Sequence, residues 1–76
     1  MTPLTLHRVN DQVARVLDHQ GCCVGNLKRI GAVWKFKALG QDVDGHAVPG
    51  GGPLTDRHNM AFTVLDEAAV SAALLA

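Results

Sequence analysis

Aromatic side chains are scarce: among 76 residues there are two phenylalanines, one tryptophan and no tyrosine. The hydrophobic core of this chain must therefore consist mainly of valine, leucine and alanine. A domain of this size buries only about 60% of the surface that its unfolded chain exposes. We therefore expect residues 1–76 to form one small domain that gains further burial from a second copy or a protein partner.

Cysteine and long apolar runs are also scarce. Cys22 and Cys23 are adjacent, and neighbouring side chains of an extended segment point to opposite sides, so the two make poor disulfide partners for each other. No run approaches the roughly 20 apolar residues of a membrane-spanning helix. The first residues lack the charged start and apolar stretch of a signal peptide. We therefore expect a cytoplasmic protein without membrane contacts.

Negative charge is missing from the middle of the chain. No acidic residue occurs between Asp18 and Asp42, although the net charge of the whole protein is zero. A binding surface with a positive charge is therefore predicted there, while the neutral total weighs against a dedicated nucleic-acid-binding domain. Four of the seven lysines and arginines lie in this stretch: Lys28, Arg29, Lys35 and Lys37.

The same stretch predicts an antiparallel hairpin with strands near 22–30 and 33–40, joined by Gly31-Ala32. A glycine in the first position of a two-residue loop favours the primed β-turns, whose backbone twist matches that of the two strands. This register places Trp34 and Phe36 on one face, which we predict to face the core. The opposite face carries the candidate partner-binding residues: Val24, Asn26, Lys28, Ile30, Val33, Lys35, Lys37 and Leu39.

Residues 3–20 are predicted to form a helix. Thr2-Pro3 suits its first turn, and Gly21 suits the left-handed residue that follows a last turn. A strand across 12–18 is the competing interpretation, because valine favours strands. A compromise would start the helix at Asn10, capped by its side chain. The helical spacing extends over more of the apolar residues: Leu6, Val9, Val13, Val16 and Leu17.

The C-terminal half is predicted to contain a long loop, a strand and a second helix. Residues 40–59 are rich in turn-forming residues, and Gly50-Gly51-Gly52 is typical of a flexible linker. Apolar side chains alternate over residues 60–64, which indicates a third strand. Asp66 can cap the helix that follows it.

The predicted class is α+β: helix, strand, strand, long loop, strand, helix, with both helices on one face of a three-stranded antiparallel sheet. In layout this order resembles the double-stranded RNA-binding domain, which also runs helix, three strands, helix. That family places a basic cluster at the start of its second helix, where this chain reads Leu65-Asp-Glu-Ala-Ala69. The resemblance therefore transfers no site residues to this chain.

Patterns typical of metal sites and of catalysis are weak. The four histidines and two cysteines lack the close pairs with short spacers of zinc ligands. Asp42-x-Asp44 begins like a calcium loop but has no closing glutamate. Asp56 and His58 are near in sequence, yet nothing brings a nucleophile to them. We therefore predict no metal, no cofactor and no enzymatic activity.

Together these features predict a small non-catalytic binding module. Apolar pairs at both ends of the row of lysines are typical of an interface, so the basic and apolar sheet face is expected to mediate self-association or the docking of a protein partner. The alternative is a nucleic-acid-binding domain in which Lys28, Lys35 and Lys37 contact phosphates.

Overall fold

A computed structural model describes residues 4–76; Thr2 and Pro3 lie outside the described residues. The described chain forms one six-stranded antiparallel sheet, one α-helix, α1 (Glu67–Leu74), and one 3₁₀-helix, η1 (Thr55–Arg57). The fold is therefore mostly β, and the predicted α+β arrangement of three strands and two helices is wrong. The strands are β1 (Thr5–Arg8), β2 (Val13–Leu17), β3 (Cys23–Ile30), β4 (Val33–Gln41), β5 (Ala47–Pro49) and β6 (Ala61–Phe62).

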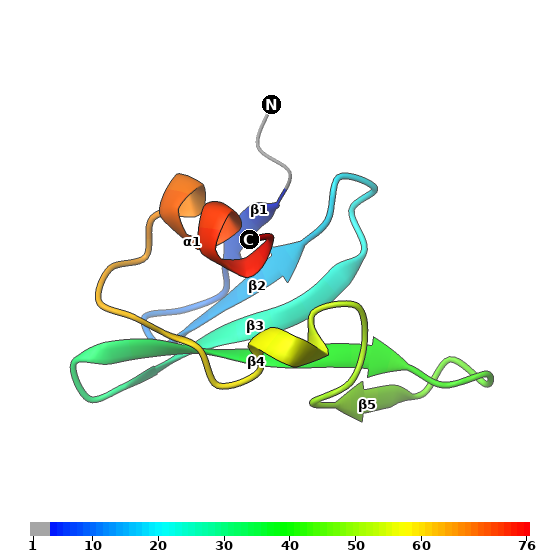
Figure 1. Ribbon diagram of the computed structural model, residues 1–76. Helices are drawn as coiled ribbons and strands as arrows, with labels where there is room; N and C mark the ends of the chain where they lie inside the picture. The colour runs from blue at the N-terminus through cyan, green and yellow to red at the C-terminus, as the bar shows by residue number, and fades with distance from the viewer. Residues whose placement is uncertain (1–3) are drawn as a thin grey trace.

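Successive hairpins build the sheet in the order β1-β2-β3-β4-β5 (Figure 1). The short strand β6 also pairs with β4. β5 pairs with the C-terminal part of β4, where Gly40 faces Val48. β6 pairs near the start of β4, where Trp34 faces Phe62. Two short strands therefore share one edge of β4. Figure 1 shows α1 lying across one face of the sheet, near β1 and β2.

The helix predicted over residues 3–20 is replaced by the β1–β2 hairpin. Leu6 is the cross-strand partner of Val16, so apolar residues spaced as on a helix meet across a turn instead. Asn10 caps this turn rather than a helix, because its Oδ1 accepts the backbone N–H of Gln12 at 2.8 Å. Because β1 and β2 replace the predicted helix, the described chain does not have the element order of the double-stranded RNA-binding domain.

Acidic side chains close two further turns of the meander, β2–β3 and β4–β5. Asp18 Oδ1 accepts two backbone N–H groups of the β2–β3 turn, each at 2.9 Å. Gly21 lies in that turn with a φ of 82° instead of ending a helix. Asp42 Oδ1 accepts two N–H groups of the β4–β5 turn, also at 2.9 Å. Acidic residues thus lie outside the strands, none of which contains one.

The predicted β3–β4 hairpin is confirmed, with a register that runs from Gly25 opposite Ala38 to Ile30 opposite Val33. Trp34 is only 7% exposed and Phe36 is fully buried, so the predicted core face is also confirmed. The ring of Phe36, on the next strand, fills the space beside Gly25, so a Cβ at this position would collide with it.

The core lies between the sheet and α1. Asp66 Oδ1 accepts the Ala68 N–H at 3.0 Å, which confirms the predicted helix cap. Leu54 and Met60, which flank η1, pack against the same core. Among residues 4–76 the helix is too short to cross a membrane. The buried apolar residues are Leu4, Ala14, Val16, Val24, Leu27, Trp34, Phe36, Ala38, Val70 and Leu74.

The segment predicted to be a loop over 40–59 contains β5, η1 and the last residues of β4. Its glycine run is not a flexible linker. A Cβ at Gly40 would collide with the backbone of Gly52, and a Cβ at Gly52 would collide with the backbone of Leu39. Two backbones therefore cross in direct contact here. The predicted strand over 60–64 is shorter than expected, because β6 contains only Ala61–Phe62.

Candidate functional site

The sheet face opposite α1 is the candidate site. Successive side chains of a strand point to opposite faces of the sheet, so the core residues and the strand registers determine which side chains lie on this face. Among the described residues none of these side chains is buried. We call this surface the open face; in β1–β4 it consists of Thr5, His7, Val13, Arg15, Leu17, Cys23, Asn26, Lys28, Ile30, Val33, Lys35, Lys37, Leu39 and Gln41.

Positive charge gathers on the open face. Arg15 faces Asn26, and Asn26 faces Lys37, which forms a row across three strands. Lys28 and Lys35 form the neighbouring pair. Four of the seven lysines and arginines of the chain therefore lie here, while the strands contain no acidic residue. Such a surface attracts anions and acidic partners.

Seven of the eight predicted partner-binding residues lie on the open face, and Val24 does not. Val24 is 5% exposed and belongs to the core. The reason is an irregularity in the pairing of β2 with β3: Val16 pairs with Gly25, but Leu17 pairs with Cys23. Val24 is thus an extra residue in β3, and a β-bulge of this kind redirects its side chain.

Apolar side chains accompany the cations on this face. Ile30 is 51% exposed at the tip of the β3–β4 hairpin, and its partner Val33 is half-buried. Leu39, near the other end of β4, is also half-buried. Of the two apolar pairs expected at the ends of the row of lysines, Ile30 with Val33 is therefore present, whereas Val24 does not join Leu39, because the described β3–β4 register ends at Gly25.

A hollow of about 260 Å³ opens where the open face meets the segment after β5. Four of the predicted residues line it, and no acidic side chain of the described residues does. Lys35 and Ile30, which share the face, lie outside it. The residues that line the hollow are Asn26, Lys28, Lys37, Ala38, Leu39, Pro49, Gly50 and His58.

His58 also lines the hollow, although the sequence singles out no binding role for this residue by itself. Its Nδ1 accepts the backbone N–H of Ala38 at 3.0 Å, while the Ala38 carbonyl accepts the Gly50 N–H at 2.8 Å. A neutral imidazole that accepts at Nδ1 carries its hydrogen on Nε2, which is then a donor. No sequence pattern marks this role, because it arises only when η1 folds back against β4.

Lys37 is held beside His58 by a neighbouring amide. Its Nζ donates to Asn59 Oδ1, and the side chain is half-buried. An ammonium group has further N–H donors beyond the one used here. The contact therefore positions the charge at the hollow without exhausting its hydrogen-bonding capacity.

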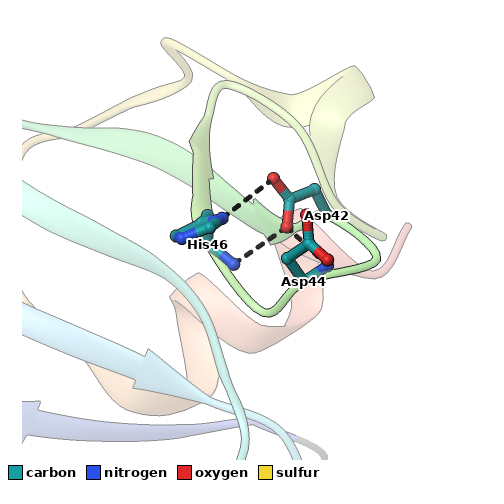
Figure 2. Close-up of side chains that lie close together, drawn as sticks. All are labelled: Asp42, Asp44 and His46. Atoms are coloured by element: carbon teal, nitrogen blue, oxygen red, sulfur yellow. Dashed lines mark hydrogen bonds and ion pairs between the residues drawn. The ribbon is translucent and has the colours of Figure 1, made fainter.

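The turn between β4 and β5 brings Asp42, Asp44 and His46 together (Figure 2). Their potential metal-ligating atoms lie within 4.8 Å of one another, and all three residues are exposed. His46 Nδ1 lies 3.5 Å from Asp42 Oδ2, and Asp42 Oδ1 accepts the N–H groups of the other two residues. These contacts close the turn and explain why the three side chains lie together.

The other chemically reactive candidates do not form a joint site. Cys23 Sγ donates to the Gly25 carbonyl at 3.3 Å, and Cys22 is exposed; both thiols are free. Among the described side-chain hydrogen bonds, His58 pairs with Ala38 and not with Asp56 or a cysteine. Within residues 4–76 the described hydrogen bonds thus bring no nucleophile to Asp56 and His58.

No protein-family model, no curated protein and no solved structure matches this chain. The open face and its hollow are therefore the features of the chain that bear on its function.

Proposed function

We propose that this domain is a non-catalytic binding module that docks an acidic protein segment on the open face of its sheet. One observation supports this proposal above all: Arg15, Lys28, Lys35 and Lys37 share a face on which β1–β4 place no acidic side chain. Opposite charge on the partner would guide its approach and fix its orientation.

The apolar side chains on the open face favour a protein as the partner. Ile30, Val33 and Leu39 lie beside the lysines and retain exposed surface, and a protein partner can bury them. All three aromatic residues lie on the opposite, core side of the sheet, because Phe62 pairs with the buried Trp34 and Phe36 is itself buried. The open face thus lacks the aromatic platform on which single-stranded nucleic acids stack.

Docking would use side chains rather than an added strand. At one edge of the sheet the Leu4 N–H donates to Ser71 Oγ and the Leu6 N–H donates to Glu67 Oε2. On the other side, β5, β6 and His58 cover the edge of β4, and the outermost strand β5 has only three residues and ends in Pro49. Edges occupied in this way leave few free groups for strand addition.

Self-association through this face is the less favoured variant. A symmetric dimer uses the same patch on both copies, so it would bring two sets of lysines together. Like charges in one interface oppose binding. A head-to-tail contact would avoid this repulsion, with Asp66 and Glu67 of one copy facing the lysines of another, but such a contact does not close on itself unless it forms a ring.

Nucleic-acid binding is the second candidate, and the cluster of cations supports it. Lys28, Lys35 and Lys37 could neutralise phosphates, which supply most of the affinity in such complexes. The net charge of zero counts against this candidate, since nucleic-acid-binding domains are commonly basic overall.

Two adjacent residues of β3 provide a matched test. Lys28 is exposed on the open face, whereas Arg29 is exposed on the opposite face of the same strand. Lys28→Glu and Arg29→Glu make the same change in charge. Retention of both variants and the parent protein is measured on immobilised poly-L-glutamate and on immobilised duplex DNA, with rising salt.

The proposal predicts that the parent protein and Arg29→Glu are retained on poly-L-glutamate, whereas Lys28→Glu elutes at lower salt. Equal loss in both variants would show that only total charge matters and would contradict a docking face. Stronger retention on DNA than on poly-L-glutamate would favour the second candidate. Sedimentation of the parent protein at several concentrations checks for self-association.

A further inference from the structure

We propose that the hollow at the edge of the open face is a binding site for a single phosphate group, either inorganic phosphate or a phosphate monoester. This inference deepens the proposed function, since a phosphorylated side chain of an acidic partner would bring such a group to the open face. The proposal depends on the donors around the hollow rather than on the charge of the whole face.

Four of the residues that line the hollow carry side-chain hydrogen-bond donors: Asn26, Lys28, Lys37 and His58. Lys28 and Lys37 supply ammonium groups, and Asn26 supplies a side-chain amide. His58 contributes Nε2–H when its ring is neutral, because Nδ1 is occupied by the Ala38 N–H. Among residues 4–76 no carboxylate lines the hollow. A phosphate has several acceptor oxygens and can use donors that approach from different directions.

Two of the donors are held by contacts within the protein. Lys37 is tied to Asn59, and the ring of His58 is fixed by its bond to the backbone of β4. Donors that are fixed before the ligand arrives lose less conformational entropy when they bind it. The site therefore differs from a group of freely moving surface lysines.

The size of the hollow limits the ligand. Its volume of about 260 Å³ is below the ~300–1,000 Å³ of pockets for drug-sized ligands. Leu39 and Pro49 give part of the lining an apolar character, which suits the carbon atom that carries a phosphate ester. A nucleotide or larger cofactor would extend beyond this space.

The test uses inorganic phosphate as the probe and the amide NMR spectrum of the isotope-labelled protein as the readout, at constant ionic strength. Saturable shifts are expected at the amides of Ala38 and Gly50. Lys37→Met and Lys28→Met should each weaken phosphate binding by about tenfold, which is the loss of one charge-assisted hydrogen bond. The matched control is Lys35→Met, because Lys35 lies on the same strand and face as Lys37 but outside the hollow. The phosphate affinity of this variant should stay within about twofold of that of the parent protein, because a charge that makes no direct contact contributes little.

A second arm identifies the source of the phosphate. An acidic peptide is titrated with and without one phosphoserine. Tighter binding of the phosphorylated form than of both inorganic phosphate and the plain peptide indicates a group presented by a partner. Phosphopeptide binding that is no tighter than that of inorganic phosphate indicates the free ion.

The absence of saturable shifts with phosphate, or an equal loss in Lys35→Met and Lys37→Met, would overturn the site. Neither result depends on retention by poly-L-glutamate, which tests the docking face itself. The exposed Lys28 serves as the second variant if the loss of the Asn59 contact disturbs folding in Lys37→Met.

Discussion

Lys28 and Lys35 are direct cross-strand partners on the open face. Like charges in this position destabilise a hairpin, and opposite charges stabilise it, by roughly 0.2–1 kcal/mol. A surface that keeps two lysines in this register retains a local cost in stability. This cost is consistent with selection for binding.

The first prediction follows from this pair. Lys35→Glu should raise the free energy of unfolding by about 0.2–1 kcal/mol, because an opposite-charge pair replaces a like-charge pair. The same variant should bind poly-L-glutamate less well than the parent. Chemical denaturation measures the stability. The double variant Lys28→Glu/Lys35→Glu restores like charges and should lose the gain; an additive gain would show that the pair does not interact.

The second prediction concerns the edge of β1. Ser71 is 3% exposed, and its Oγ accepts the N–H of the equally buried Leu4 at 3.2 Å. Ser71→Ala leaves that N–H without a partner and should lower the free energy of unfolding by about 1–3 kcal/mol. Thermal denaturation provides the measurement. Glu67→Gln is the control, because it keeps an acceptor for the Leu6 N–H and should change stability much less.

The third prediction separates backbone conformation from close packing. Gly45 and Gly52 have φ values of 82° and 87°, but only Gly52 has atoms in the way of a Cβ. Gly45→Ala should lose about 1–2 kcal/mol, the cost of a left-handed alanine. Gly52→Ala should lose roughly a further 1–3 kcal/mol through overpacking against Leu39. Equal losses in chemical denaturation would contradict the backbone crossing.

The fourth prediction concerns the imidazole that completes the β4 edge. His58→Ala removes the acceptor of the buried Ala38 N–H and should destabilise the fold by about 1–3 kcal/mol. In hydrogen exchange the Ala38 amide should lose protection. The amide of Phe36, which donates to the Met60 carbonyl at 2.8 Å, serves as the internal reference. Unchanged protection at Ala38 would show that the side-chain bond is dispensable.

The β3–β4 hairpin could be predicted from sequence because its information is local. Gly31-Ala32 sets the register, and the alternation around Trp34 and Phe36 identifies the core face. The N-cap of α1 could also be predicted from local sequence, because Asp66 directly precedes the helix. The lysine arrangement on the open face follows from the same register.

The β1–β2 hairpin was missed because a chain reversal imitated a helical period. Leu6 and Val16 share the core face as partners in opposite strands, whereas Val13 points to the open face. The spacing alone placed all three on one helix face. Strand propensity of the valines favoured the correct interpretation, and Asn10 can cap a turn as well as a helix.

The position of Val24 and the role of His58 depended on contacts that the sequence does not encode locally. The bulge at Val24 exists only because β2 pairs with β3, and β2 was assigned to a helix. His58 reaches Ala38 only after the intervening segment, residues 39–57, folds back onto β4. Both errors therefore come from tertiary structure rather than from local propensity.

The central claim is that the open face, and not the face covered by α1, docks an acidic partner. It is tested most directly by mapping amide NMR shifts of the isotope-labelled protein as poly-L-glutamate is added. The account predicts shifts concentrated at Arg15, Asn26, Lys28 and Lys37, reduced in Lys28→Glu but not in Arg29→Glu. Shifts confined to α1 and η1, or no shifts at all, would contradict it.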